Sequence, residues 1–189
     1  FVDEFDAQGE FVGIAAEAYR ISKDRDFLAA IIEPVVRATF FIDELCARTN
    51  ALHGPESRFH GLLPRSISHE GYAEPTYSYW DDYFALSAWR DCEYLANEAG
   101  EKETAVRAKA RGQAFAANFA RSLRMTAELL GKGLITGSAD RGDIDPTSTS
   151  IAFEPCRVED VLPHELLQAT YDFSAARIKS ISAPDFEGS

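Results

Sequence analysis

Apolar residues recur along this chain at spacings of three and four positions, which is the pattern of amphipathic helices rather than of strands. In the first such segment, residues 9–22, the apolar positions are Phe11, Val12, Ala15, Ala16, Tyr19 and Ile21. Asp24 is a suitable N-cap for a second helix that runs to about Thr49. We therefore predict a helical hairpin. Pro34 is expected to bend or break its second helix near Glu33, because proline removes a backbone donor.

A second helical pair is predicted after a long loop at 51–77. Its first helix, over 79–99, is apolar on almost all sides and is therefore expected to be buried. Gly100 is a stop signal, and the helix that follows over 101–130 has the mixed surface of a helix with one face in solvent. The pair thus predicts one inner helix and one outer helix.

A third pair follows a second loop, at 131–145. Its inner helix is short and begins at Pro146, with Asp145 as a plausible N-cap, and Pro155 ends it. An outer partner is expected over 158–179. The whole pattern predicts an all-α fold of antiparallel helical hairpins.

The composition fits one soluble globular domain with a sizeable core, since 46% of the 189 residues are hydrophobic and 26% are charged. We predict one domain over residues 1–179, followed by a tail or linker at 180–189. No run of about eighteen apolar residues is present, so no membrane contact is expected, and the first residues do not form a signal peptide. Export of the parent protein to the periplasm or the extracellular space would require a signal upstream of residue 1.

The formal net charge of −12 argues against nucleic-acid binding and favours an uncharged or cationic ligand. The three cysteines, at positions 46, 92 and 156, are odd in number and far apart, which argues against a disulfide framework. Cys46 and Cys92 lie in apolar helical stretches and are expected to be small buried hydrophobes. No helix carries a His-x-x-x-His pair, so no metal is expected, and no motif requires a cofactor.

The start of the apolar helix at 79 carries the most distinctive chemistry of the chain. Asp81 and Asp82 lie in its first turn, after a loop rich in tyrosine. Because two uncompensated carboxylates are costly to bury, we expect this end of the helix to reach water. Carboxylates next to aromatic rings suit a sugar ligand, because such rings combine apolar faces with polar tips.

Three strings can now be compared with known families: HEGY at 69–72, SYWDDYFAL at 78–86 and GDIDPTSTS at 142–150. With the order of elements, they resemble bacterial members of the six-hairpin, (α/α)6-barrel glycosidase superfamily, particularly large multidomain proteins that often carry discoidin-like modules. A full barrel needs about twelve helices, so six predicted helices amount to about half of such a toroid. Half a barrel exposes an apolar face, so we expect either self-association through that face or a chain rearranged from the family arrangement.

The resemblance implies that loops leading from an outer to an inner helix line the active site, and in this chain each such junction is acidic. Glycoside hydrolysis uses two carboxyl groups, one of them protonated. The candidate catalytic residues are Glu70, Asp82 and Asp143. The candidate substrate-binding residues are Tyr72, Glu74, Tyr77, Trp80, Asp81, Arg141 and Asp145. We expect the loop at 60–78 and the junction at 140–149 to converge on a shared cleft that binds carbohydrate.

Each candidate also has a structural alternative. Asp81 can close a capping box with Ser78, and Asp145 can simply cap its helix. Trp80 and the tyrosines of this region can be core residues, and Arg141 can form a surface ion pair.

The leading interpretation is a fragment of a glycoside hydrolase domain that acts on an oligosaccharide by inversion, with carboxyls roughly 6.5–9.5 Å apart. The isolated chain is expected to be nearly inactive, because the partner carboxylate is expected on hairpins outside it. The alternative is a non-catalytic helical scaffold that binds glycan or protein. A third hypothesis, a metal-dependent isoprenoid synthase, would require a further aspartate at the position of Ala85.

Overall fold

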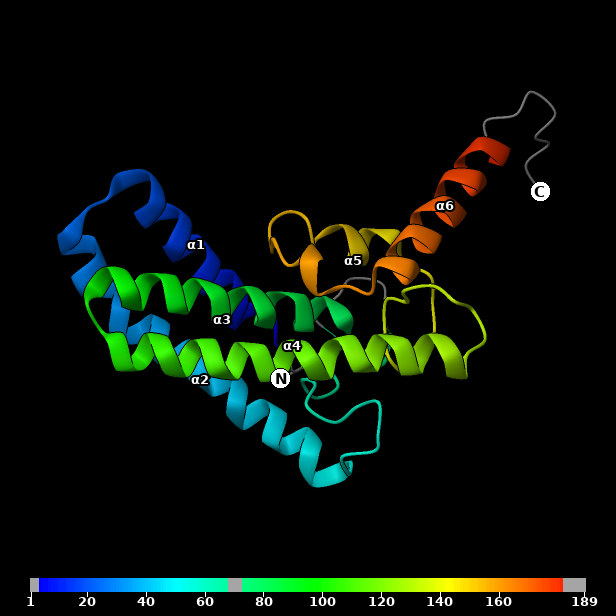
Figure 1. Ribbon diagram of the computed structural model, residues 1–189, viewed down its shortest axis with the longest axis horizontal. Helices are drawn as coiled ribbons and strands as arrows, with labels where there is room; N and C mark the ends of the chain where they lie inside the picture. The colour runs from blue at the N-terminus through cyan, green and yellow to red at the C-terminus, as the bar shows by residue number, and fades with distance from the viewer. Residues whose placement is uncertain (1–3, 68–72, 182–189) are drawn as a thin grey trace.

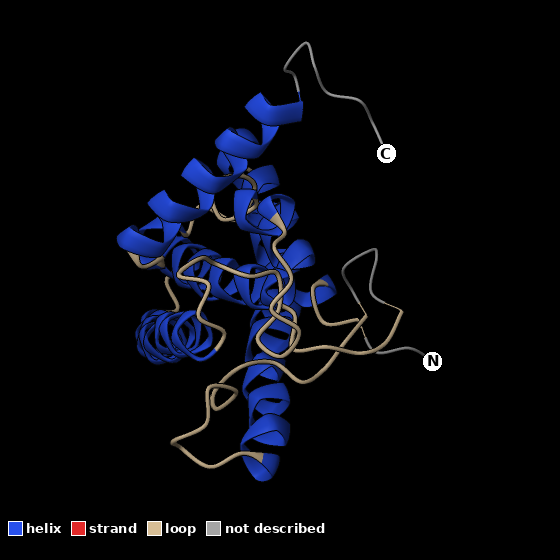
Figure 2. Ribbon diagram, turned by 90° about the vertical axis from the view of Figure 1, so that its right-hand side faces the viewer, coloured by secondary structure: helices blue, strands red, loops and turns tan. Residues whose placement is uncertain are grey.

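The computed structural model describes residues 4–67 and 73–181, and in them the protein is all-α, as predicted (Figure 1). The helices are α1 (Ala7–Ser22), α2 (Arg25–Leu52), α3 (Tyr79–Ala99), α4 (Lys102–Leu129), α5 (Pro146–Ser150) and α6 (His164–Ile181), with a 3₁₀ turn at Glu159–Val161. Across these residues no extended strand is formed, and the loops carry just two isolated β-bridges (Figure 2).

The helix boundaries follow the local signals of the sequence. The side chain of Asp24 accepts hydrogen bonds from the first turn of α2, and Gly100 ends α3 in the left-handed conformation with φ +83°. Pro34 does not break α2, which runs through it as one helix of 28 residues. Ile32 and Val35, which flank the proline, are both buried, and their packing holds this turn in place.

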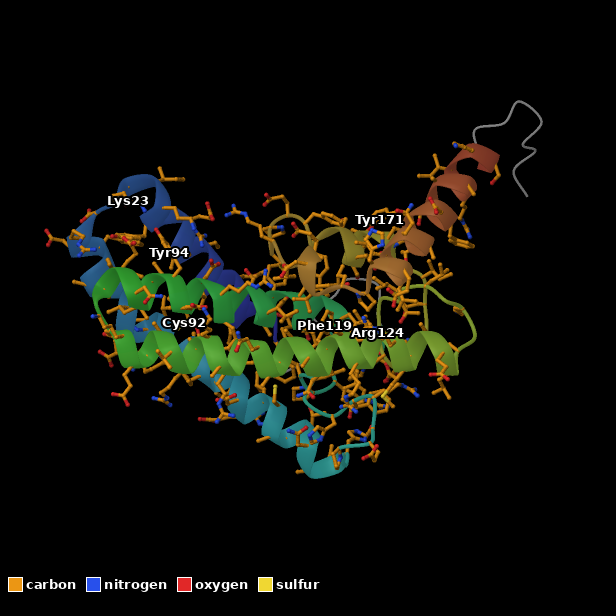
Figure 3. All side chains as sticks on the ribbon, in the orientation of Figure 1. Lys23, Cys92, Tyr94, Phe119, Arg124 and Tyr171 are labelled. Atoms are coloured by element: carbon orange, nitrogen blue, oxygen red, sulfur yellow. The ribbon has the colours of Figure 1, made fainter. Side chains whose placement is uncertain are left out.

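Helices α1 and α3 run parallel to each other. Near their starts the indole N–H of Trp80 donates to Asp6 at 3.0 Å, and near their ends the hydroxyl of Tyr19 donates to Glu98 at 2.9 Å. The ends are also joined by Lys23, which donates to the hydroxyl of Tyr94, and the two side chains lie together in Figure 3. The start of α1 thus contacts the start of α3, and the end of α1 contacts the end of α3, as expected of parallel helices.

Helices α2 and α4 are parallel to each other and antiparallel to α1 and α3. The guanidinium of Arg107 lies over the ring of Phe40, and one turn further along both helices Arg111 pairs with Asp43. The array therefore consists of two antiparallel hairpins, α1–α2 and α3–α4, in which the first helices run parallel to each other and so do the second helices.

The core is centred on α3, which packs against α1, α2 and α4. Trp89 meets Phe40 of α2 edge to face at 5.3 Å, and Tyr83 meets Phe119 of α4 at 5.1 Å. On the side of α1, a Cβ atom added to Gly9 would lie 2.3 Å from the carbonyl oxygen of Phe84. Glycine is required there because the two helices approach each other so closely.

The third helical pair differs from the prediction. Helix α5 is a single turn, too short to pair along the length of α6, and α6 begins at His164 rather than at 158. Figure 1 shows α6 extending away from the four-helix array. Its Phe173 and Ile178 are exposed, so α6 has an apolar surface in contact with solvent.

The three cysteines are free thiols. Cys92 is buried as predicted, whereas Cys46 is only half-buried and its Sγ lies 3.6 Å from the carbonyl oxygen of Gly61. Burial raises the pKa of Cys92 to about 11 and that of Cys156 to about 12, so both are protonated at neutral pH. These thiols behave as small apolar side chains.

Candidate functional site

Two loops that are far apart in the sequence lie side by side at the end where α3 begins. Ser66 and Thr76 exchange two backbone hydrogen bonds of 2.9 Å within the first loop. The first loop then meets the second through Tyr79 N to Gly137 O at 3.0 Å and Ala139 N to Tyr77 O at 2.8 Å. The first loop therefore lies against residues 137–139, just before the expected junction at 140–149, while Asp82, which was expected to point into a shared cleft, is buried.

Asp140 braces the two loops against each other. One of its carboxylate oxygens accepts from the hydroxyl of Thr76 and, at 3.2 Å, from the backbone N–H of Tyr77. The other oxygen pairs with Arg65 at 3.3 Å. Asp140, a residue of the second loop, thus accepts hydrogen bonds from donors in the first loop.

Asp81 and Asp82 are both buried, so the expectation that these carboxylates reach water is wrong. The hydroxyl of Ser66 donates to Asp81, and the backbone N–H of Leu63 donates to Asp82 at 3.0 Å. Burial, together with the neighbouring charge of Asp81, raises the pKa of Asp82 well above its usual range. The hydrogen bonds thus lower the cost of burial, and the pair fastens the preceding loop to α3.

The other aromatic and acidic candidates of the loops also have structural contacts. Tyr77 is buried, stacks on Phe59 at 4.4 Å and has its hydroxyl 2.6 Å from His53. Asp143 accepts from the hydroxyl of Ser138 at 2.6 Å. Asp145 accepts from two backbone N–H groups of α5, which confirms the predicted N-cap.

Trp80 lies half-buried where α1 and α3 start, and its ring is 5.6 Å from that of Phe84. Arg141 is exposed and donates to the carbonyl oxygen of Glu74 at 2.8 Å. Glu74 itself is exposed. Two further candidates, Glu70 and Tyr72, lie outside the described residues.

A groove of about 720 Å³ lies between α1, α3 and the segment 155–157 and follows α1 from Gly9 to Arg20. Its lining includes Gly9, Glu10, Gly13, Phe84, Ser87, Asp91, Arg20 and Arg157. None of the sequence-predicted site residues that the structure describes lines it. The groove is therefore a second candidate site, distinct from the two loops.

A chain of ion pairs crosses one wall of the groove. Arg20 donates to Asp91 and to Glu17, each at 2.5 Å, and Glu17 also pairs with Arg157 at 2.9 Å. Burial raises the pKa of Asp91 against the opposing effect of Arg20. Burial acts on Glu17 in the same sense, but the hydrogen bonds from Arg157 and Arg20 outweigh it and lower the pKa of Glu17.

Glu10 lies at the end of the groove nearest to Trp80. It is an exposed carboxyl group one turn before Gly13 on α1. Partial burial raises its pKa, and the negative charges of Asp6 and Glu4 act in the same direction. A carboxyl with a raised pKa that remains open to solvent can bind a ligand and can transfer a proton.

Sequence reasoning missed the groove because its polar residues come from positions far apart, such as Arg20 and Asp91. The available signals were an aspartate deep inside an otherwise apolar helix and the Gly9-x-x-x-Gly13 spacing on α1. Comparison of the chain with protein-family models, curated proteins and solved structures gave no match.

Two further properties concern the residues that the structure describes. In residues 4–67 and 73–181, no cluster of three or more His, Cys, Asp or Glu side chains is arranged to hold a metal ion. The same part of the chain has no helix that is long and apolar enough to cross a membrane.

Proposed function

We propose that this chain is part of a carbohydrate-active helical domain and that the complete domain hydrolyses glycosidic bonds. The observation that carries the proposal is the arrangement of α1 and α3, the first helices of the two hairpins. Helices α1 and α3 run parallel, and their starts gather at one end with Trp80 and the two converging loops. This is the layout that the resemblance to six-hairpin glycosidases implies.

The chemistry of this end is compatible with a sugar ligand. Trp80 is half-buried and so presents part of its ring to solvent, while its N–H is held by Asp6. Aromatic rings of this kind bind the apolar faces of sugars. Glu10, with its raised pKa, is suited to the general acid role that glycoside hydrolysis requires. In this proposal Asp82 and Asp143 position the loops, and Glu70 stays a candidate for the second carboxyl.

Binding of the purified chain to a panel of neutral oligosaccharides tests the proposal. We expect Trp80→Ala to abolish binding and Trp80→Phe to retain most of it, because phenylalanine keeps an aromatic face. Tyr171→Ala is the matched control, since Tyr171 is a half-buried aromatic on α6 that packs on Phe153 and does not line the groove. Absence of binding to every glycan, or equal loss in the Tyr171 and Trp80 variants, would refute a sugar site at this end.

A second candidate function is a non-catalytic scaffold that binds glycan or protein. It is favoured by the structural engagement of Asp81, Asp82 and Asp145, which hold a loop or cap a helix. A glycoside hydrolase would turn over its oligosaccharide, whereas a scaffold would only bind it. A parent domain that binds oligosaccharides but releases no reducing ends, with Glu10→Gln unchanged in binding, would favour the scaffold.

We also propose self-association through the apolar face of α1. Phe11, Ile14 and Ile21 are exposed and lie on one side of this helix. Light scattering after size-exclusion chromatography tests it, with Ile21→Lys expected to shift the chain to a monomer, because Ile21 is exposed and does not line the groove. A wild-type chain that is monomeric at high micromolar concentration would contradict this proposal.

A further inference from the structure

The groove between α1, α3 and the segment 155–157 has the size and the open floor of a small-molecule site. Its volume of about 720 Å³ is within the usual range for ligand pockets, roughly 300–1,000 Å³. A Cβ atom added to Gly13 would meet just one heavy atom within 4 Å, Asp91 Oδ2 at 3.9 Å. The space beside Asp91 is therefore available because position 13 carries no side chain.

The charges that line the groove balance. Three carboxylates, Glu10, Glu17 and Asp91, face three guanidinium groups, Arg20, Arg90 and Arg157. Arg20 and Arg157 are both paired with carboxylates of the lining, and Arg90 makes a bidentate pair with Asp160. A charged ligand would have to compete with these pairs and lose its own hydration, so a neutral ligand is favoured.

The polar groups of the floor nevertheless offer many hydrogen bonds. Ser87 supplies a hydroxyl next to the Asp91 carboxylate, at 3.5 Å from its Oδ2. Carboxylate oxygens accept and guanidinium groups donate, so a ligand with adjacent hydroxyl groups can satisfy both kinds of partner. Phe84 and Pro155 add apolar surface against which the C–H face of a ring can pack.

We propose that this groove binds a neutral saccharide of one or two pyranose units. The proposal rests on the proposed function and deepens it, because it gives the ligand class of a groove lined by Glu10 and by Phe84, whose ring lies 5.6 Å from that of Trp80. It assigns direct contacts with hydroxyl groups to Ser87, Asp91 and Arg20. In this proposal Asp81 and Asp82, the aspartates at the start of α3, do not contact the saccharide.

The test uses cellobiose, maltose and trehalose as neutral probes, with glucuronic acid and glucosamine as charged probes, in calorimetric titrations. Gly13→Phe places a ring in the groove from a partly exposed position that lines it, and Gly13→Ala is the matched control with a single methyl group. We expect a neutral disaccharide to bind wild type, Gly13→Ala to bind within about threefold of it, and Gly13→Phe to lose at least about tenfold in affinity. Ser87→Leu, which obstructs the opposite wall, is expected to give the same loss.

The outcomes separate the two proposals. Binding that survives Gly13→Phe and Ser87→Leu but is lost in Trp80→Ala would overturn the groove and leave the proposed function intact. Failure of all three disaccharides to bind wild type would overturn the groove proposal, and a negative result on the wider oligosaccharide panel would overturn the function as well. Tighter binding of glucuronic acid or glucosamine than of the disaccharides would refute the preference for a neutral ligand.

Discussion

Substitution of Asp82 can separate the two roles of a buried carboxyl group, as a hydrogen-bond acceptor and as a site of charge. The carboxyl accepts from Leu63 N at 3.0 Å, and Asp82 and Leu63 are both buried. Asp82→Ala removes the acceptor and leaves a buried N–H group without its partner. Asp82→Asn keeps a carbonyl oxygen in the same place and removes the ionisable group.

The expected magnitudes differ between the two variants. An unsatisfied buried donor costs about 1–3 kcal/mol, so Asp82→Ala should lower the free energy of unfolding by that amount at neutral pH. In a chain of this size each kcal/mol lowers the melting temperature by roughly 2–4 °C. Asp82→Asn should change the free energy of unfolding by less than about 1 kcal/mol, because the hydrogen bond to Leu63 is kept and no buried charge has to be accommodated.

The two proteins should also respond differently to pH. The pKa of Asp82 is raised in the folded state, by burial first and then by the charge of Asp81, relative to an ordinary value of about 3.9 in the unfolded chain. Its contribution to stability is therefore fully present below the unfolded pKa and is lost as pH rises towards the folded pKa. Across that window wild type should lose up to about 1.4 kcal/mol per pH unit relative to Asp82→Asn.

Urea unfolding of wild type, Asp82→Asn and Asp82→Ala at a series of pH values between about 4 and 8 measures both effects. The difference between wild type and Asp82→Asn isolates the titration of this one group from that of the others. Asp82→Ala as stable as wild type would refute the loop-fastening role. A wild-type protein that gains stability over Asp82→Asn as pH rises would show that the folded pKa is lowered rather than raised.

Three further outcomes are expected. Gly9→Ala should cost about 1–3 kcal/mol in thermal or urea unfolding, because its Cβ would lie 2.3 Å from the carbonyl oxygen of Phe84. An unchanged melting temperature would show that the helices can separate freely. Asp145→Ala should lose about 1 kcal/mol of local stability at α5, detectable as faster amide exchange at Thr147 and Ser148, whereas Asp145→Asn should lose much less. The isolated chain should show almost no release of reducing sugar from oligosaccharides, and robust turnover abolished by Glu10→Gln would contradict that expectation.

The helices could be predicted because their signals are local. The N-cap at Asp24, the stop at Gly100 and the apolar surface of α3 each depend on residues within a few positions, and the structure confirms all three. The third pair was less predictable. Helical periodicity over 158–179 predicts that a helix forms but not where that helix packs. The direction of α6 depends on which other surface its apolar residues can contact.

The environment of Asp81 and Asp82 could not be predicted from local pattern. Two acidic residues in a first helical turn are favoured by the helix dipole and normally point to solvent. Their burial depends on Leu63 and Ser66, which lie in the preceding loop and reach α3 only after that loop folds back. The sequence thus indicated that the start of α3 is chemically distinctive but not that its two carboxyl groups are buried.

The presence of Asp91 in the middle of α3 can be explained either by a role in ligand binding or by its ion pair with Arg20. The two explanations predict different results for a variant that lacks the pair. As a structural group, Asp91 needs only Arg20, which lies on the neighbouring parallel helix. An ion pair of this kind, with a buried aspartate and a partly buried arginine, is often no more stable than apolar residues of the same size, so Arg20→Met with Asp91→Leu should fold well. If the pair were retained for packing alone, the double variant would bind saccharide as wild type does. Because we assign Asp91 and Arg20 to ligand hydroxyl groups, we expect a folded double variant that has lost saccharide binding.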